Sequence, residues 1–179
     1  MKQITLILIA VVFASTKCYS QRFFTREGIT EFSASEDTFE PVEAKSRTTT
    51  VIVDVAKGDI IAQVFIASFE FKNALMQEHF NENYMESSLF PKAIFRGTIN
   101  GFSENNQQGR FELSGTLTIR DIERKIHTDL LVEEVNGSLV LSAKFAVLTE
   151  DFNIKIPSIV KGKIAEKVII NLNYELQEK

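Results

Sequence analysis

Apolar and polar residues alternate along most of this chain, and no other feature constrains its fold as strongly. The alternation is cleanest at 111–119, where Phe111, Leu113, Leu117 and Ile119 are separated by polar or small residues. Successive side chains of a β-strand point to opposite faces, so this segment predicts a strand with one apolar and one solvated face. Similar segments recur between short turns and predict about eight strands in sequence.

Short turns separate these segments and favour antiparallel neighbours. Asn136-Gly137 is a strong hairpin signal, because both residues accept a positive φ, and Lys57-Gly58-Asp59 predicts another turn. An open sheet of this length would leave two exposed edges, and closure removes them. We therefore expect an all-β protein, built as a closed antiparallel barrel.

One segment, 69–95, interrupts the alternation. Leu75, Phe80 and Tyr84 fall close to one stripe at helical spacing, and polar residues lie between them. Pro91 ends the pattern, because proline lacks a backbone N–H and restricts the residue before it. The pattern predicts one short helix that covers part of the barrel. Before it, 60–71 is expected to form one continuous strand.

The apolar faces of the strands are expected to point into the barrel. About eight strands enclose an interior that is either filled by side chains or holds one small ligand. Small inward residues such as Ala67, Gly97 and Gly115 leave space. A lumen lined by phenylalanine and aliphatic side chains would bind an alkyl or prenyl chain by burying it. From the pattern alone, a filled barrel is the simpler interpretation.

Three segments, in this order, are similar to segments of the YceI-like family. They are FKNALMQEHFNENYMESSLFPKAIFRG at 71–97, GTLTIRDIERKI at 115–126 and DFNIKIPSIVKGKIAEKVIINLNYEL at 151–176. The resemblance spans roughly 28–176. It implies a periplasmic, lipocalin-like barrel that binds isoprenoid or other long-chain lipids, and it also fits a homodimer. After Ile119 the family usually has His-Gly or Arg-Gly, whereas this chain has Arg120-Asp121, so the shape of one barrel mouth stays open.

With this resemblance we predict that the lumen binds a long-chain isoprenoid or acyl lipid and that no other cofactor is needed. The predicted ligand-binding residues are Phe65, Phe69, Leu75, Phe80, Phe95, Ile99, Phe111, Leu113, Leu117, Leu141, Phe145 and Ile170. Arg96 and Arg120 would meet a lipid head group if the resemblance holds, although two surface arginines are the simpler reading.

Two other kinds of protein compete with a lipid carrier. A filled barrel would act as a protein-interaction or scaffold module without a lipid ligand, and this alternative stays open. An outer-membrane barrel would show aromatic girdles at both membrane interfaces. This chain has no Trp and three Tyr, and its predicted helix has no place in such a barrel.

Few residues point to catalysis or to metal binding. His79 and His127 are the only histidines, and nothing in their spacing brings them together with a carboxylate. Glu78, Glu82 and Glu86 recur every four residues, which favours a solvated helical stripe over paired catalytic carboxylates. No nucleophile elbow, phosphate loop or zinc helix motif occurs. We therefore predict neither an enzyme nor a metal site.

Residues 1–20 are predicted to be a secretory signal peptide. A short positive start precedes an uncharged apolar run at 4–14, which is shorter than the about 20 residues of a membrane span. One barrel domain, 21–179, would follow and be periplasmic or secreted. The single cysteine, Cys18, falls within the predicted peptide, so no disulfide is expected. The net charge of −4 argues against nucleic-acid binding.

Overall fold

The computed structural model describes residues 21–35, 41–158 and 164–179. Its strands are β1 (Arg22–Ser35), β2 (Glu43–Asp54), β3 (Asp59–Phe65), β4 (Glu70–Phe71), β5 (Lys92–Asn100), β6 (Gly109–Ile119), β7 (Ile122–Val135), β8 (Ser138–Leu148) and β9 (Ile164–Glu178). The predicted signal peptide lies outside the described residues.

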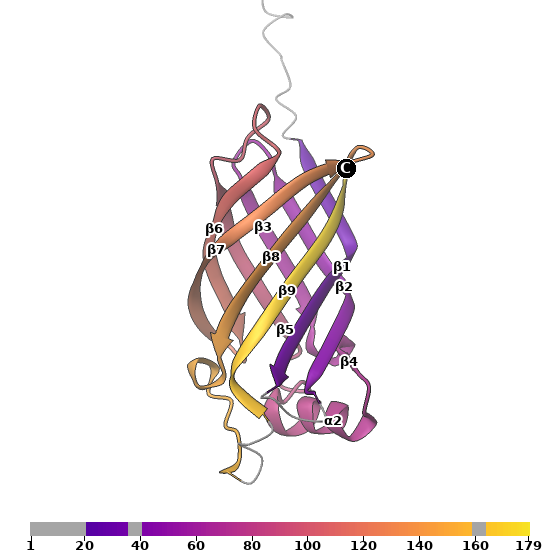
Figure 1. Cartoon of the computed structure of the whole chain (residues 1–179), viewed down its shortest axis with the longest axis vertical. Helices are drawn as coiled ribbons and strands as arrows, with labels where there is room; N and C mark the ends of the chain where they lie inside the picture. The colour runs from indigo at the N-terminus through magenta and orange to yellow at the C-terminus, as the bar shows by residue number, and fades with distance from the viewer. Residues whose placement is uncertain (1–20, 36–40, 159–163) are drawn as a thin grey trace, which may run out of the picture.

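All neighbouring strands are antiparallel, in the order β1-β9-β8-β7-β6-β5-β3-β2-β4, and pairing of β1 with β2 closes the sheet. Eight strands form the barrel, and the two-residue β4 extends it beside β2 (Figure 1). The predicted all-β, lipocalin-like barrel with one short helix is confirmed. Closure removes the sheet edges that an open arrangement of these long strands would expose.

Tight two-residue turns join the strands at both ends of the barrel. The hairpin predicted at Asn136-Gly137 is confirmed, with φ of +53° and +82°. Arg120-Asp121 makes a similar turn between β6 and β7, with φ of +50° and +59°. Positive φ at both central residues gives a twist that matches the flanking strands. The departure from the family pattern therefore still makes a compact turn.

The predicted helix is confirmed and lies across one end of the barrel (Figure 1). It consists of α2 (Ala74–His79) and a π-helical turn, η2 (Phe80–Tyr84). Asn73 begins α2, because its Oδ1 accepts hydrogen bonds from the backbone N–H groups of Leu75 at 2.9 Å and Met76 at 3.3 Å. The helical segment ends at Tyr84, before Pro91.

The expected continuous strand at 60–71 is wrong. β3 ends at Phe65, and a 3₁₀ turn, η1 (Ile66–Ser68), follows it. Ser68 Oγ donates a hydrogen bond to the carbonyl oxygen of Phe65 at 2.6 Å, which closes this turn. The inward residues of β3 are Ile60, Ala62 and Val64. Phe65 therefore faces outward, and only after the turn does Phe69 return to the interior.

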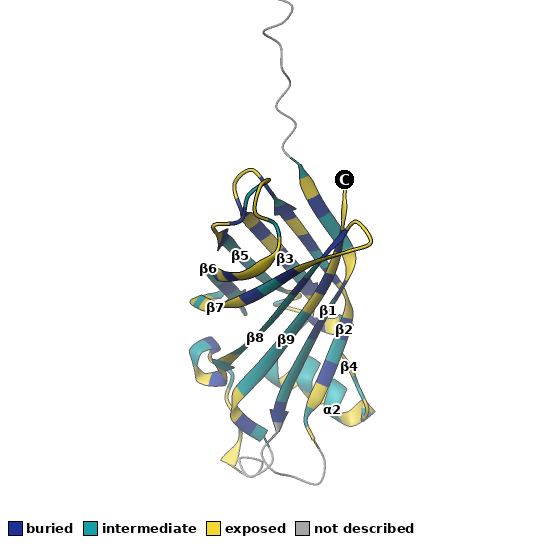
Figure 2. Ribbon diagram, turned by 45° about the horizontal axis from the view of Figure 1, so that its top comes forward, coloured by how far each residue is buried: buried dark blue, intermediate teal, exposed yellow. Residues whose placement is uncertain are grey.

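The two ends of the barrel differ in how fully they are packed. The end opposite α2 holds one dense cluster of buried side chains. Figure 2 marks buried residues in dark blue along the strands. The buried members are Phe23, Val51, Val53, Val55, Ile60, Ala62, Ile99, Phe102, Phe111, Leu113, Leu130, Val132, Leu139, Leu141, Tyr174 and Leu176. We call this half the packed end. In the half of the barrel beneath α2, the side chains leave part of the interior empty.

Candidate ligand-binding cavity

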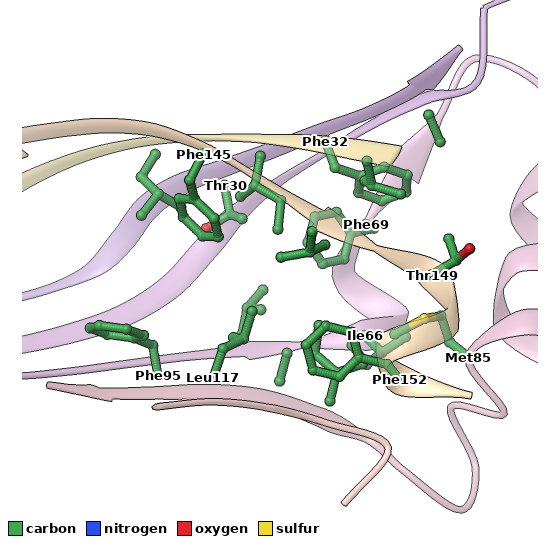
Figure 3. A pocket seen from close by; sticks show the side chains of 18 of the residues that line it. Thr30, Phe32, Ile66, Phe69, Met85, Phe95, Leu117, Phe145, Thr149 and Phe152 are labelled. Carbon is green, nitrogen blue, oxygen red and sulfur yellow. The ribbon is translucent and has the colours of Figure 1, made fainter. Parts of the chain in front are cut away.

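A cavity of about 760 Å³ occupies the half of the barrel beneath α2 (Figure 3). Its size falls within the range of small-molecule sites in proteins. Its wall is made of inward side chains from all eight barrel strands, and nearly all of them are apolar. The polar exceptions are Thr30, Thr49, His79, Tyr84, Thr149 and Tyr174. No Lys, Arg, Asp or Glu of the described chain lines it.

Two glycines facing each other shape one side of this wall. Gly97 on β5 pairs with Gly115 on β6, and the ring of Phe95 lies against both. A methyl group added at Gly97 or Gly115 would lie 2.7 Å or 2.6 Å from Cζ of Phe95. The space that the glycines were expected to leave is therefore taken up by the ring of Phe95. The ring lies along the wall because the glycines have no side chains in its way.

Aromatic rings join the helix to the rim of the cavity. The ring of Phe80 stacks on Phe32 with centroids 5.3 Å apart, and it meets Phe71 at 5.0 Å and Phe69 at 5.9 Å. Ring pairs at these separations add to the apolar area that they bury. Phe80 therefore holds the helical segment over the mouth.

The opposite side of the mouth is held by Arg120. Its Nη1 donates a hydrogen bond to the carbonyl oxygen of Asn153 at 2.8 Å, and its Nη2 forms an ion pair with Glu86. Its guanidinium also lies 5.5 Å from the ring centre of Phe90. Arg120 is therefore not a free surface arginine, because it links the β6–β7 turn to two other segments. Arg96 is exposed on the outer face of β5.

Next to Asn153, a short 3₁₀ segment, η3 (Thr149–Phe152), narrows the mouth. The side chain of Phe152 is buried in it, and Figure 3 shows Phe152 close to Ile66. Thr149, Phe152, Ile154 and Ile156 all line the cavity. The sequence gives no helical period at Thr149–Phe152, so η3 was not predicted, but the alternation of Phe152, Ile154 and Ile156 with polar residues was an available signal for three of these lining positions.

A hydroxyl cluster marks the inner end of the cavity. Thr30 Oγ1 lies 2.8 Å from Thr49 Oγ1 and 3.0 Å from Tyr174 Oη, and all three residues are buried. Burial raises the pKa of Tyr174 well above its ordinary value of 10.0, against a smaller opposite effect of the Thr30 hydrogen bond. The alternation of the strands does not assign these three residues a role. The available signal was a hydroxyl-bearing residue among mostly apolar inward positions on each of three strands.

Most of the predicted ligand-binding residues line the cavity. They are Phe69, Phe80, Phe95, Leu113, Leu117, Leu141, Phe145 and Ile170. Ile99 and Phe111 face inward but lie in the packed end, away from the cavity. Phe65 and Leu75 do not line it either, since they are 49% and 58% exposed. For Phe65 the cause is the end of β3, and Leu75 lies on the exposed part of α2, away from the lining residues Met76 and His79.

The histidines lie apart from any metal-binding group. His79 lines the cavity from α2, whereas His127 is exposed on the outside, 3.4 Å from Glu112. Within the described residues no group of three His, Cys, Asp or Glu side chains is placed to hold a metal ion. Among the helices of the described ranges, none has the length and apolar character to cross a membrane.

A closed antiparallel barrel with one deep apolar cavity defines a lipocalin-like class of protein. Within this class, the chain belongs to the YceI-like domain family, whose model matches residues 20–176. No curated protein shows a significant match to this chain.

Solved structures share the fold at low sequence identity. A polyisoprenoid binding domain from Saccharophagus degradans, implicated in plant cell wall breakdown, has a TM-score of 0.74 at 12% identity, covering 88% of this chain and 98% of that one. BcnA of Burkholderia cenocepacia has a TM-score of 0.68 at 15% identity, with coverages of 83% and 95%. The YCEI protein of Campylobacter jejuni has a TM-score of 0.55 at 19% identity, with coverages of 74% and 80%.

Proposed function

We propose that this protein binds a long-chain isoprenoid or acyl lipid in the barrel cavity and stores or carries it without chemical change. The observation that carries the proposal is a cavity of about 760 Å³ whose described lining includes no Lys, Arg, Asp or Glu. The family and the Saccharophagus domain, described as polyisoprenoid binding, support the same ligand class. The signal-peptide pattern at 1–20 supports a periplasmic or secreted location.

The lining suits a hydrocarbon chain better than a polar metabolite. Each methylene group moved from water into an apolar site contributes about 0.8 kcal/mol. A chain of roughly ten carbons would therefore bind usefully even after the loss of its freedom of motion. The alternative function assumes a barrel filled by side chains, and only the packed end fits that assumption. The homodimer stays a prediction.

Lipid uptake by purified protein tests this function directly. We expect native mass spectrometry to detect a bound amphiphile, and we expect displacement of a fluorescent fatty-acyl probe by isoprenoid or acyl lipids. Leu117→Arg places a charge on the cavity wall and should weaken probe binding at least about tenfold, because a buried unpaired charge is unfavourable. Thr116→Arg, at the neighbouring outward position of β6, is the matched control and should bind the probe normally.

Circular dichroism of each variant separates loss of binding from loss of folding. If Leu117→Arg does not fold, Leu117→Trp, which narrows the cavity without a charge, replaces it. Wild-type protein that is folded, empty after purification and unable to take up any lipid probe would contradict the proposed function.

A further inference from the structure

The inner end of the cavity differs chemically from its wall. The hydroxyl groups of Thr30, Thr49 and Tyr174 come from β1, β2 and β9 and meet where the cavity borders the packed end. Figure 3 shows Thr30 beside Phe145, deep in the barrel and away from the mouth residues Met85 and Thr149. A ligand that fills the cavity would therefore bring one of its ends to these hydroxyl groups.

The backbone of β1 holds the cluster in place. The register of β1 against β2 shifts on both sides of Gly28, which bends the strand at this point. The ring of Tyr174 lies directly against Gly28, and a methyl group added there would be 2.7 Å from Cδ1 of the ring. The missing side chain of Gly28 thus allows the ring to lie flat, with its hydroxyl group next to Thr30.

The cluster keeps hydrogen-bonding capacity for a ligand. Three hydroxyl groups carry three protons, but only two contacts join them, from Thr30 to Thr49 and from Thr30 to Tyr174. No other described side chain or backbone group hydrogen-bonds to these hydroxyl groups. At least one donor is therefore left for a ligand atom, together with unused lone pairs. A buried hydroxyl proton without an acceptor is unfavourable, so an acceptor at this place would be stabilising.

The surroundings favour an uncharged partner. The described lining includes no Lys or Arg near the cluster, and burial keeps Tyr174 protonated because its pKa is raised. A phosphate or carboxylate placed here would lose its hydration without gaining a counter-charge. A neutral hydroxyl, carbonyl or amide would meet a neutral donor and acceptor, which fits this site.

Building on the lipid-binding function proposed above, we propose that the Thr30–Thr49–Tyr174 cluster binds the uncharged polar end of a long-chain lipid, such as an alcohol, aldehyde or amide. The hydrocarbon chain then extends toward the mouth beneath α2. The cavity accordingly selects neutral lipids over phosphorylated lipids of the same chain length.

Competition for the fluorescent probe with four ligands of equal chain length tests this selection. The ligands are 1-hexadecanol, hexadecanamide, hexadecane and hexadecyl phosphate, each delivered from cyclodextrin. We expect the alcohol and the amide to bind about fivefold to tenfold more tightly than hexadecane, since each gains a buried hydrogen bond. Hexadecyl phosphate should bind more weakly than the alcohol.

Variants that remove the hydroxyl groups and keep the shape connect this preference to the cluster. Removal of Thr49 or Tyr174 alone leaves two hydroxyl groups with one spare donor, so the decisive variant is Thr30→Val/Thr49→Val/Tyr174→Phe. It should reduce the preference for 1-hexadecanol over hexadecane to about twofold or less, because the ligand loses every hydroxyl partner. Thr50→Val, one residue along β2 and outside the barrel, is the matched control and should keep the wild-type preference. Thermal unfolding checks that each variant folds. If the triple variant does not fold, Thr49→Val/Tyr174→Phe, which keeps only the hydroxyl group of Thr30, should show a smaller loss of the same preference.

Two outcomes would overturn the inference, and each differs from failure of the proposed function. Lipid binding with no preference for the alcohol, or with a preference that survives in folded variants, contradicts the assigned role of the cluster alone. If hexadecyl phosphate binds more tightly than 1-hexadecanol, the proposed preference for uncharged lipids is wrong. Absence of binding by every ligand and by the probe contradicts the proposed function itself.

Discussion

At the scale of single residues, Gly97 and Gly115 determine how much interior is left for a ligand. They face each other on β5 and β6, and the ring of Phe95 lies on the flat surface that they provide. A larger side chain at either position would push the ring into the cavity. Glycine normally weakens a strand, so its presence here reflects the close approach of another group.

Gly115→Ala is therefore expected to destabilise the protein. The added methyl group would contact the backbone of Arg96 and the ring of Phe95, and such overpacking costs about 1–3 kcal/mol. Urea unfolding measures the change in unfolding free energy. Ser114→Ala, on the outer face of the same strand, should change it by less than about 0.5 kcal/mol. An equal change in both variants would contradict the close approach of Phe95.

Residue by residue, the alternation predicted which side chains face inward but not what each of them does there. Phe95 and Leu117 are predicted to face inward because each shares a period-2 face with other apolar or small residues, and both line the cavity. Thr30 and Thr49 stand at equally inward positions. The alternation along a strand looks the same whether an inward threonine is isolated or belongs to a cluster with residues of other strands. The hydroxyl cluster depends on contacts between β1, β2 and β9, which the spacing within one strand does not contain.

At the scale of elements, the mouth is framed by segments that Arg120 ties together. The guanidinium reaches Glu86 after the helix and Asn153 after η3, while Arg120 itself belongs to the β6–β7 turn. Only 17% of the Arg120 side chain is exposed, so its ion pair is less screened by water than a surface pair. The positions of the helix and of η3 relative to the barrel therefore depend on one side chain.

Replacement of this side chain should loosen the mouth. We expect Arg120→Gln to lower the free energy of unfolding by about 1–3 kcal/mol, because charged hydrogen bonds to partly buried partners are lost. Hydrogen exchange should become faster at the backbone amides of 80–90. In the matched variant Arg124→Gln, the lost partner is Asp151, 3.7 Å away and exposed, and the change should stay below about 1 kcal/mol. If amide hydrogen exchange at 80–90 is unchanged in Arg120→Gln, Arg120 does not hold the helical segment in place.

Element boundaries were predicted well where one period held and poorly where it changed. The helix at 74–84 was predicted from its apolar spacing, and it covers the mouth as expected. The strand predicted before the helix is too long, because Phe65, Phe69 and Phe71 have the spacing of one apolar strand face. The 3₁₀ turn at Ile66–Ser68 changes the register between them, and hydrogen bonds from Ser68 Oγ to Phe65 O and from Phe69 N to Ile66 O close it.

At the scale of the whole molecule, the barrel is solid at one end and hollow at the other. Alternation predicts an apolar face along a whole strand, but it carries no information about depth along the barrel axis. For this reason Ile99 and Phe111 were predicted to bind a ligand although they belong to the packed end. Whether the interior is filled depends on the summed volumes of side chains from eight strands, which no single segment specifies.

The same truncation should cost different amounts at the two ends. Leu139→Ala in the packed end is expected to lower the unfolding free energy by about 2–5 kcal/mol, because it leaves a new void. Leu172→Ala, whose side chain borders the existing cavity, should cost less than about 2 kcal/mol, since it has fewer contacts to lose. Urea unfolding of the lipid-free variants measures both values. Equal losses would indicate that the cavity is closed up in solution.

Closure of the barrel through β1 also brings its first and last strands side by side. Lys179 N donates a hydrogen bond to the carbonyl oxygen of Arg22 at 2.9 Å, at the end of the barrel far from α2 (Figure 1). A tag or surface linker attached at Gln21 or Lys179 would therefore lie at the end of the barrel opposite α2. Immobilised in this way, the protein would present the cavity mouth beneath α2 to the solution, where an added lipid probe could reach it.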